Sequence, residues 1–368
     1  MVVSIRQFLF DTAFLIICLI KLIPGMEGID NYFMLFASLI LAFKIYQDGF
    51  TKKELLGIMA CVLPALGCLF IAREANVLSV VMLIAAMKGI DTKREIKLLA
   101  MVSTIIFLTV FLLSKAGVIY DDIYYFSRVG EITVRHSYGF KHPNQMFLRY
   151  FIILILFIYI MADNLKLKHI VITMPLSYFM YVATKSRTGM ICIVILYLAV
   201  FILKYGGKKI NKLMAWGFSY TCIIISVISG IMLFIPKESL LFIFLDRLFT
   251  GRIYLMQKYF EKNSATILGS PLASGIVIDN SYIYMLTHYG IAIILCYIAI
   301  TAFVSKRCYK QKNYYALFII GLIHIYAFME NVLVSSTFNI TFLFIGSMLY
   351  TKSLDNLRFD KQNQAEVL

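Results

Sequence analysis

The sequence predicts an all-α, polytopic integral membrane protein with about twelve transmembrane helices and two long extracytoplasmic loops. Its 368 residues are 61% hydrophobic and only 15% charged, and the mean hydropathy is +0.84. Apolar runs of roughly 15–23 residues recur along almost the whole chain, separated by short charged segments. These runs lack the period-two alternation of barrel strands, so helices are the structure that satisfies their backbone groups in lipid.

The apolar runs define a single transmembrane domain of residues 1–351, followed by a polar cytoplasmic tail of residues 352–368 that we expect to be disordered. The first run contains Asp11 and Lys21 and has no small-residue cleavage site, so we interpret it as a retained span. Several runs are short, which gives the count a margin of about two spans. The expected spans lie near residues 8–24, 32–46, 55–71, 77–90, 98–117, 146–161, 169–183, 190–203, 213–235, 282–304, 314–332 and 338–350.

Lysine and arginine concentrate in alternate connections, which orients the chain. If the spans are correct, these connections share one side, and that side is the cytoplasm, together with both termini. The loops of residues 118–145 and 236–281 and the short turn 184–189 then face the extracytoplasmic side of the cell membrane. The formal net charge of +15 follows this topology and does not indicate nucleic-acid binding. The basic connections contain Lys44, Lys52, Lys53, Lys88, Lys93, Arg94, Lys97, Lys166, Lys168, Lys204, Lys208, Lys209, Lys212, Lys306, Arg307, Lys310 and Lys312.

The spacing of the cysteines and the lack of known cofactor motifs predict a site without a metal or a cofactor. Seven cysteines lie mostly inside apolar runs and lack the spacing of metal ligands, so packing is their expected role. The sequence contains no phosphate-binding loop, no zinc signature and no dinucleotide fingerprint.

The first long loop carries the densest group of polar side chains, within residues 135–144. Gly139 and the turn at Pro143 make a compact bend plausible, and a bend lets the side chains converge on one ligand. The alternative is an ordinary solvated loop between two membrane helices. The candidates for contact with a substrate are Arg135, His136, Lys141, His142 and Asn144.

The second long loop contains a segment, residues 239–262, with the pattern of a helix at the membrane surface. On a helical period Leu241, Leu245, Leu248, Leu255 and Tyr259 share one apolar face, which also carries Arg252. An arginine turned toward the protein calls for an anionic partner, and its planar fork suits a diphosphate. Arg247, Lys258 and Lys262 lie on another face and are expected to meet lipid headgroups or water, although Arg247 stays a candidate ligand.

Asp279 and Asn280 stand where the chain re-enters the membrane after this loop. A partly desolvated carboxylate there is a candidate general base, and either residue is also a candidate helix N-cap. Tyr282 follows them as a further substrate contact. In the outward turn, Arg187 is either a snorkelling anchor or a phosphate ligand. Glu330 is interpreted as a simple charge at the end of a late helix.

These motifs together resemble the oligosaccharide repeat-unit polymerases of capsule, exopolysaccharide and O-antigen synthesis, within the O-antigen ligase/polymerase superfamily. The resemblance covers residues 135–290 by motif and the whole chain by topology; no single motif is decisive. It rests on Arg-x-Ser-x-Gly-Phe-x-His-Pro-Asn (135–144), Ser-Arg-Thr (186–188), Asp-Arg-Leu-x-x-Gly-Arg (246–252), Gly269, Asp-Asn-Ser-Tyr (279–282) and Gly290.

The resemblance implies a metal-independent glycosyltransferase with a helical membrane fold. Such an enzyme transfers a growing glycan from a polyprenyl diphosphate to the next lipid-linked repeat unit, on the outer face of the membrane. In the related ligases a histidine before an asparagine is the proposed base, whereas this chain has Asp279 before Asn280. The candidates for the base are Asp279, His142 and His136. Asp279 ranks ahead of His142 because it follows the long loop at the mouth of a helix, where the related ligases hold their base. The expected partners are the polyprenyl-diphosphate-linked oligosaccharide, membrane lipid, and a flippase and chain-length regulator of the same pathway.

Two other classes of protein remain open. A ligase that attaches finished glycan to another acceptor uses the same donor chemistry. A lipid-linked oligosaccharide flippase or small-molecule transporter also has about twelve spans, but it places its polar groups at mid-membrane between repeated halves. This chain has unequal polar loops and no evident repeat.

Overall fold

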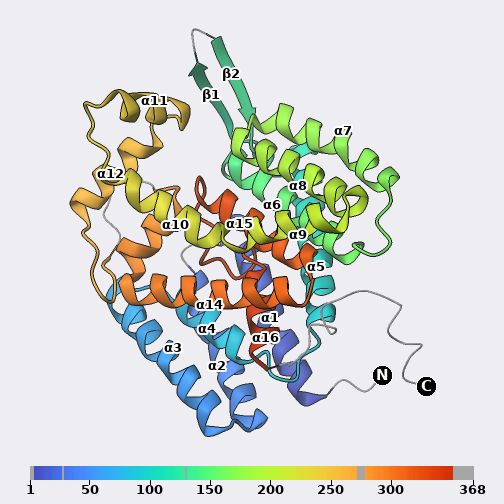
Figure 1. Cartoon of the computed structure of the whole chain (residues 1–368), viewed down its shortest axis with the longest axis vertical. Helices are drawn as coiled ribbons and strands as arrows, with labels where there is room; N and C mark the ends of the chain where they lie inside the picture. The colour runs from blue at the N-terminus through green and yellow to red at the C-terminus, as the bar shows by residue number, and fades with distance from the viewer. Residues whose placement is uncertain (1–3, 27–28, 129–130, 272–277, 351–368) are drawn as a thin grey trace.

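A computed structural model describes residues 4–26, 29–128, 131–271 and 278–350. Most of the described residues are helical, and a two-stranded hairpin lies between α5 and α6 (Figure 1). The elements are α1 (Ile5–Leu22), α2 (Asp30–Asp48), α3 (Lys52–Ala72), α4 (Asn76–Ala85), α5 (Thr92–Lys115), β1 (Ile123–Arg128), β2 (Glu131–His136), α6 (Pro143–Ile160), α7 (Leu167–Thr184), α8 (Arg187–Tyr205), α9 (Lys208–Ser219), α10 (Thr221–Met232), α11 (Leu240–Leu248), α12 (Arg252–Lys262), α13 (Ser281–Tyr284), the π-helix η1 (Met285–Tyr289), α14 (Ile291–Lys310), α15 (Tyr314–Ala327) and α16 (Thr341–Tyr350). The tail expected to be disordered lies outside the described residues.

Several helices have the length and composition of membrane spans, which fits a multi-pass membrane protein. Within the described residues five helices are long and apolar enough, namely α3, α5, α6, α8 and α14. The pair α9 and α10, bent by 44°, adds a sixth if it is one span. Helices α4, α15 and α16 are apolar but shorter. The expected twelve spans are not confirmed.

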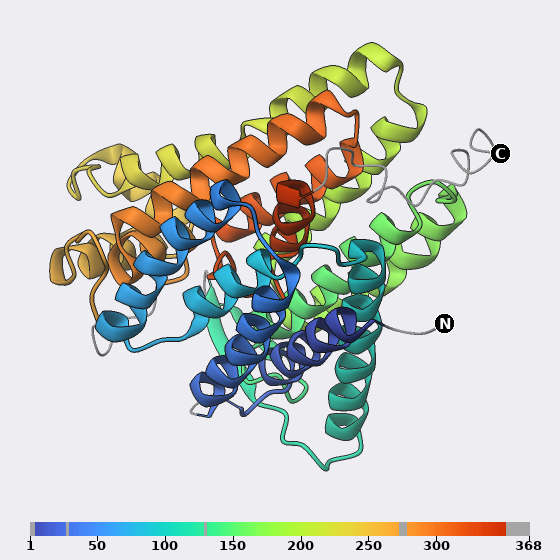
Figure 2. The ribbon, with the colours of Figure 1, turned by 90° about the horizontal axis from the view of Figure 1, so that it is seen from below.

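Two of the expected continuous spans are broken. Residues 213–235 fall in α9 and α10, which run alongside α14 (Figure 2). Residues 282–304 are divided at Gly290, whose φ of +91° ends the π-turn and begins α14. A Cβ at Gly290 would lie 2.4 Å from the backbone nitrogen of Gly269. The chain therefore bends where two glycine backbones touch, and apolar periodicity alone does not reveal such a contact.

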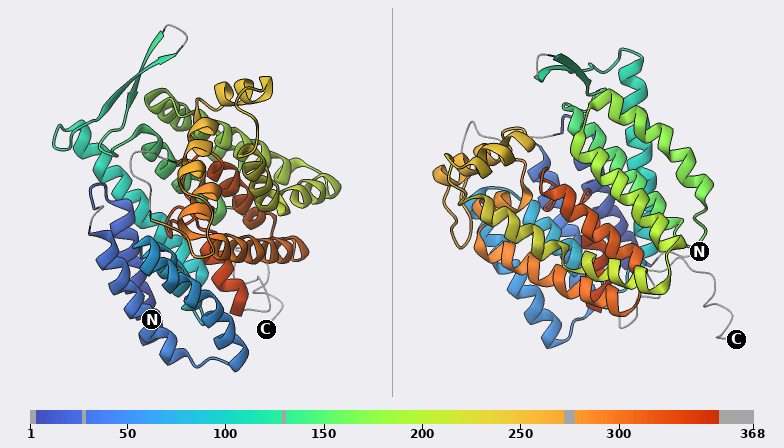
Figure 3. Two further views of the ribbon diagram at one scale, coloured as in Figure 1. Left: turned by 90° about the vertical axis from the view of Figure 1, so that its left-hand side faces the viewer. Right: turned by 45° about the horizontal axis from the view of Figure 1, so that its top comes forward.

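The first long loop is not all irregular, because β1 and β2 pair in it as an antiparallel hairpin. Figure 3 shows this hairpin projecting away from the helices. In its register Tyr124 faces Arg135, and Ile123 faces His136. The hairpin returns the chain to the helices at His136, so that residues 137–142 lead directly into α6. This small sheet qualifies the all-α prediction.

The predicted surface helix of residues 239–262 is two helices. Thr250 and Gly251 have φ of +59° and +81°, which ends α11 and begins α12. The predicted apolar face is not continuous across this break: Leu241 is 56% and Leu248 is 55% exposed, while Tyr259 is fully buried. The break at Gly251 changes the phase of the helix, so positions before and after it do not share a face.

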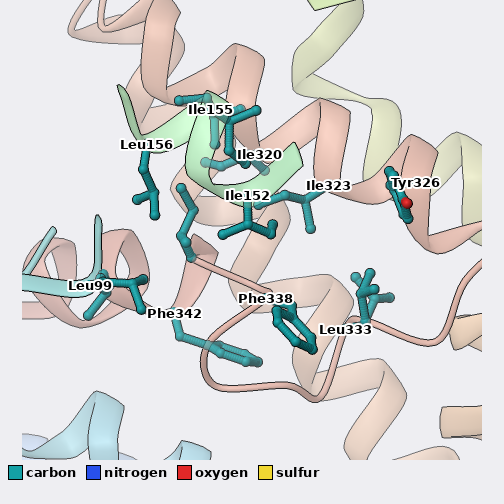
Figure 4. Close-up of a cluster of buried hydrophobic side chains, with 14 of the residues drawn as sticks. Leu99, Ile152, Ile155, Leu156, Ile320, Ile323, Tyr326, Leu333, Phe338 and Phe342 are labelled. Atoms are coloured by element: carbon teal, nitrogen blue, oxygen red, sulfur yellow. The ribbon is translucent and has the colours of Figure 1, made fainter. Parts of the chain in front are cut away.

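The core forms between α6, α15 and the chain that follows α15. Side chains of α6, including Ile152 and Ile155, face Ile320 and Ile323 of α15 in Figure 4. Leu333, Phe338 and Phe342 close the other side of the same cluster. Residues 332–340 thus run mostly through the interior, and the start of this segment lies beside α13, where the backbone N–H of Val332 donates to the Ser281 hydroxyl at 2.8 Å.

The end of α2, the start of α3 and the ends of α4 and α16 meet at one end of the molecule, which we call the basic end. Lys88 after α4 contacts Glu54 at the start of α3, with 2.8 Å between Nζ and Oε2. Lys44 near the end of α2 donates to the carbonyl of Lys88 at 2.6 Å. The Tyr350 hydroxyl at the end of α16 donates to the carbonyl of Ala85 at 3.0 Å. The connections around Lys44 and Lys88 therefore lie on one side, as the charge pattern predicts.

The opposite ends of these helices meet near the hairpin, at what we call the hairpin end. Asn31 at the start of α2 donates to the carbonyl of Arg73 just after α3, at 3.3 Å. Arg149 in the second turn of α6 donates to the carbonyl of Leu22 at the end of α1, at 3.3 Å. Both long polar loops begin and end at this end.

Candidate functional site

Arg252 is the centre of a charged cluster at the hairpin end. Its Nε lies 3.1 Å from Asp279 Oδ2, and its Nη2 lies 3.1 Å from Glu330 Oε1. Its Nη1 donates to the carbonyl oxygen of Met329. The side chains of Arg252, Asp279 and Glu330 are 22%, 32% and 9% exposed. One guanidinium thus joins α12, the segment before α13 and the segment after α15.

The turn before α12 aims Arg252 at this cluster. Gly251 adopts the left-handed conformation and caps α12, so Arg252 is the first residue of the helix. Ile253 and Met256 are buried and pack with Met232 of α10 in a separate hydrophobic cluster. Burial of these side chains fixes the rotation of α12 about its axis.

A second arginine reaches the same carboxylate through an asparagine. Arg135 on β2 donates from Nε to the carbonyl of Thr184 at 2.6 Å and from Nη2 to Asn144 Oδ1 at 2.5 Å. Asn144 in the first turn of α6 donates from Nδ2 to Glu330 Oε1 at 2.7 Å. Glu330 Oε1 therefore accepts from both sides, and the two long loops meet through it.

His142 caps the N-terminus of α6 within the same network. Its Nδ1 accepts from the backbone N–H of Asn144 at 3.2 Å, so the proton of the neutral ring lies on Nε2. Burial, together with the nearby charges of Arg135 and Arg252, lowers the pKa of His142 to about 4. His142 is therefore neutral near pH 7 and suited to donate a hydrogen bond to a ligand. An acid limb near the ordinary histidine pKa of about 6.5 in a rate profile is therefore not expected from this residue.

Asp279 is available as a base because its neighbour does the capping. The Asn280 side chain accepts from the backbone N–H groups of Tyr282 and Ile283, both at 3.0 Å. Burial raises the pKa of Asp279 above its ordinary value, while Arg252 opposes that shift. Its carboxylate thus combines raised basicity with partial exposure.

An open cleft lies beside Asp279 and Arg252. Its empty volume is about 360 Å³. The polar lining comes from Arg252, Asp279 and Asn280, and the apolar wall includes Leu255 and Phe328. A ligand in this cleft meets the cation and the carboxylate together.

Glu330 is the functional candidate that the sequence reading missed. It was interpreted as a charge at a helix end, but only 7% of the residue is exposed. Burial, opposed by Arg252, raises its pKa to about 7. Ser281 fixes its backbone, since the Ser281 hydroxyl donates to the Glu330 carbonyl at 2.6 Å. The signal in the sequence that could have identified Glu330 is its position beside Asn331 at the end of an apolar run.

His136, Lys141 and Tyr282 contact other parts of the chain. The His136 ring contacts Asp121 Oδ2 at 2.7 Å, and the Lys141 carbonyl accepts from Tyr124 at 2.6 Å. Tyr282 is 1% exposed, and its hydroxyl is 2.7 Å from His324 Nδ1, which keeps it from the cleft.

Two of the predicted arginines are exposed, Arg187 at the start of α8 and Arg247 near the end of α11. Neither pairs with another side chain in the described part of the chain. Arg187 is three residues beyond Thr184, whose carbonyl binds Arg135, whereas Arg247 lies on the far side of the Gly251 break. Arg187 therefore remains near the cluster, and Arg247 is the weaker candidate.

Comparison of the chain with models of protein families, with curated proteins and with solved structures found no match. The functional argument therefore depends on the cluster itself. Arg252 places a cation and Asp279 a carboxylate of raised pKa at the cleft, and Arg135 and the neutral His142 belong to the same network.

Proposed function

We propose that this protein polymerises polyprenyl-diphosphate-linked oligosaccharide repeat units on the outer face of the cell membrane, for synthesis of a surface polysaccharide. The observation that carries the proposal is the position of Arg252. It binds the carboxylates of Asp279 and Glu330 and lines an open cleft with Asp279. A cation and a partly exposed base side by side suit the transfer of a sugar from a charged leaving group.

In this reaction the bond between the anomeric carbon of the donor and its diphosphate oxygen breaks. The acceptor hydroxyl oxygen bonds to that carbon, its proton passes to Asp279, and polyprenyl diphosphate leaves. Arg252 stabilises the charge that develops on the diphosphate, because fixed charges at the leaving group lower the barrier without reorganisation. His142 donates to the same group from Nε2.

Glu330 acts through the arginines. It holds Arg252 directly and Arg135 through Asn144, so both guanidinium groups keep their orientation before a ligand binds. Such preorganisation is the larger part of electrostatic catalysis. Glu330 is thus a positioning residue, and Asp279 is the catalytic one.

The position of the charged cluster supports transfer over transport. The charged cluster lies among helix ends and connecting segments, at the end of the molecule opposite the basic end. Transporters, by contrast, usually bind their substrates near the middle of the membrane. A ligase shares the donor chemistry, and its acceptor distinguishes it from a polymerase.

The direct test is reconstitution of the purified full chain in phospholipid vesicles with lipid-linked repeat units. We expect a ladder of products on a gel, each longer by one repeat unit. Arg247→Ala is the matched control, because Arg247 is exposed and outside the cluster, and it should leave the ladder intact.

Other outcomes would contradict the proposal. A single product formed only after a different acceptor is added would identify a ligase. Movement of lipid-linked units across the vesicle bilayer with no change in their length would identify a transporter.

A further inference from the structure

A second cavity lies among the helices, apart from the charged cleft. Helix α3 contacts α4, α4 contacts α16, α16 contacts α14, and α14 contacts α3, so the four helices form a ring. The cavity occupies this ring and has an empty volume of about 590 Å³.

The lining of this cavity is hydrocarbon. Its walls are mostly valine, isoleucine, leucine, proline and phenylalanine side chains. Of its described lining residues, only Cys61, Cys296, Met285 and Tyr297 carry a side-chain heteroatom. The Tyr297 hydroxyl already accepts from Asn339 Nδ2 at 3.0 Å. A water molecule needs two to four polar partners to be stable in a cavity, so this space suits an apolar occupant.

The seam between α3 and α14 gives this cavity an entrance from the bilayer. Only 17% of the most apolar 18-residue stretch of α3 is buried inside the protein, so most of this helix faces outward. Cys296 on α14 is exposed, and Cys61 on α3 is half-buried. Both also line the cavity, which means that the inner space and the lipid-facing surface meet at these two residues.

The same seam is closed toward the hairpin end. The Cys68 thiol of α3 lies 3.0 Å from the carbonyl of Tyr289 and 3.5 Å from that of Leu268. A Cβ on Gly67 would lie 3.2 Å from the Leu268 side chain. The segment 266–270 therefore covers the part of the seam nearest the hairpin end. The cavity opens closer to the basic end, within the membrane-spanning part of α3.

We propose that this cavity binds one hydrocarbon chain of a membrane lipid, which enters between Cys61 and Cys296. Burial of apolar surface drives this binding, and it stands independently of the proposed glycosyl transfer.

The position of the cavity links such a chain to the charged cleft. Asp279 and Asn280 line the cleft, and Met285, a few residues later, lines the cavity. Likewise Met329 lines the cleft, and Leu333 lines the cavity. The two segments that hold Asp279 and Glu330 thus form a common wall. A bound chain packs against that wall from the side away from the charges.

Photochemical labelling tests the proposal directly. The full chain is placed in phosphatidylcholine vesicles containing either a phospholipid with a diazirine in its acyl chain or a diazirine-bearing polyprenyl phosphate. Labelled peptides are then mapped by mass spectrometry. We expect labelling at Val81 of α4 and Ile300 of α14, which line the cavity. Labelling by both probes indicates an acyl-type site of broad range, and labelling by the polyprenyl probe alone indicates an isoprenoid site.

A matched pair of variants separates the cavity from the outer surface. Val81→Trp fills the cavity and should reduce labelling at Ile300 about tenfold, the factor that corresponds to about 1.4 kcal/mol. Leu108→Trp, on the exposed face of α5, should leave that labelling unchanged. Val81→Phe and competition by unlabelled lipid on the wild-type chain serve if Val81→Trp fails to fold.

The proposal is overturned if Val81 and Ile300 are labelled no more than the same depth of the outer surface. It is equally overturned if an excess of either unlabelled lipid leaves their labelling unchanged. If the wild-type chain forms no polymer in the vesicle assay but its cavity is labelled as expected, only the proposed function is contradicted.

Discussion

Two pairs of a cation with a carboxylate, one at each end of the molecule, have similar chemistry and different surroundings. At the basic end Lys44 Nζ lies 2.6 Å from Asp48 Oδ2, with side chains 0% and 2% exposed. Lys44 also donates to the carbonyls of Ala86 and Lys88. At the hairpin end Arg252 pairs with Asp279 at 3.1 Å, and these side chains are 22% and 32% exposed.

The difference separates a structural ion pair from a site. All three protons of the Lys44 ammonium have protein acceptors, so it has none left to offer a ligand. Arg252 and Asp279 line a cleft instead, and a ligand can take over part of their interaction. The following substitutions test whether burial from solvent makes the Lys44 pair structural and exposure in the cleft makes the Arg252 pair functional.

The largest effect is expected at Asp279. Asp279→Asn keeps the size of the side chain but cannot accept a proton at neutral pH. General base catalysis contributes about 10²–10⁴-fold, so turnover in the vesicle assay should fall by that factor while lipid-linked donor still binds. Capping does not complicate this variant, because Asn280 is the cap. Near-normal turnover would remove Asp279 as the base, and His142→Gln would be the next variant to measure.

Lys44→Met is expected to lower stability rather than turnover. It leaves the buried Asp48 with Arg6 alone, whose Nε lies 3.8 Å from Oδ1, and breaking a buried pair costs about 3–5 kcal/mol. The thermal unfolding midpoint in detergent should fall, with unchanged turnover per folded molecule. The double variant Lys44→Met with Asp48→Leu should recover much of the loss. Full stability with lost turnover would place a functional site at the basic end.

Arg252→Ala and Arg135→Ala are expected to lower turnover by about a hundredfold or more, since one preorganised charge contact is worth about 3 kcal/mol. Arg187→Ala should act in the same direction. Lysine should rescue poorly, because it lacks the bidentate fork. Lys258→Ala and Lys262→Ala are controls with mild effects. Equal losses at all five positions would indicate a general electrostatic role.

The smallest effect is expected from Glu330→Gln, as a change in pH dependence. With a pKa of about 7, Glu330 is neutral below that pH and gains a negative charge above it. The cluster is then less positive above pH 7, so an anionic ligand binds more weakly there. We expect the affinity for inorganic diphosphate to fall several-fold more between pH 6 and 8 in the wild type than in Glu330→Gln. The comparison at each pH cancels the ionisation of the ligand. Parallel curves would show that Glu330 does not titrate in this range.

The sequence predicted the charged cluster better than the path of the chain. The sequence named Arg135, His142 and Asn144 for the density of polar groups around them, Arg252 for its place on an apolar helix face, and Asp279 for its place where the chain re-enters the membrane. These five residues meet in one network or at its edge. The sequence did not indicate Glu330 as a site residue, and there is a physical reason for this. Its burial depends on Arg252 and Asn144, which lie 78 and 186 positions away in the chain.

The errors in the fold have a similar origin. Hydropathy detects apolar runs, but the breaks at Gly290 and Gly251 depend on backbone conformation and on contact with distant segments. The hairpin of β1 and β2 lies in a segment that was assigned as a loop because it is polar. Pairing between two short strands is a non-local property, which the composition of one segment does not express.

The most direct test of the account is the affinity of the full chain in phospholipid nanodiscs for polyprenyl diphosphate without sugar. The measurement is made at physiological salt, for wild type, Arg252→Ala and Arg247→Ala. The account predicts that Arg252→Ala weakens binding by about a hundredfold, or about 2.7 kcal/mol, and that Arg247→Ala binds as the wild type does. Equal binding by all three proteins would contradict the assignment of the Arg252 cluster as a diphosphate site.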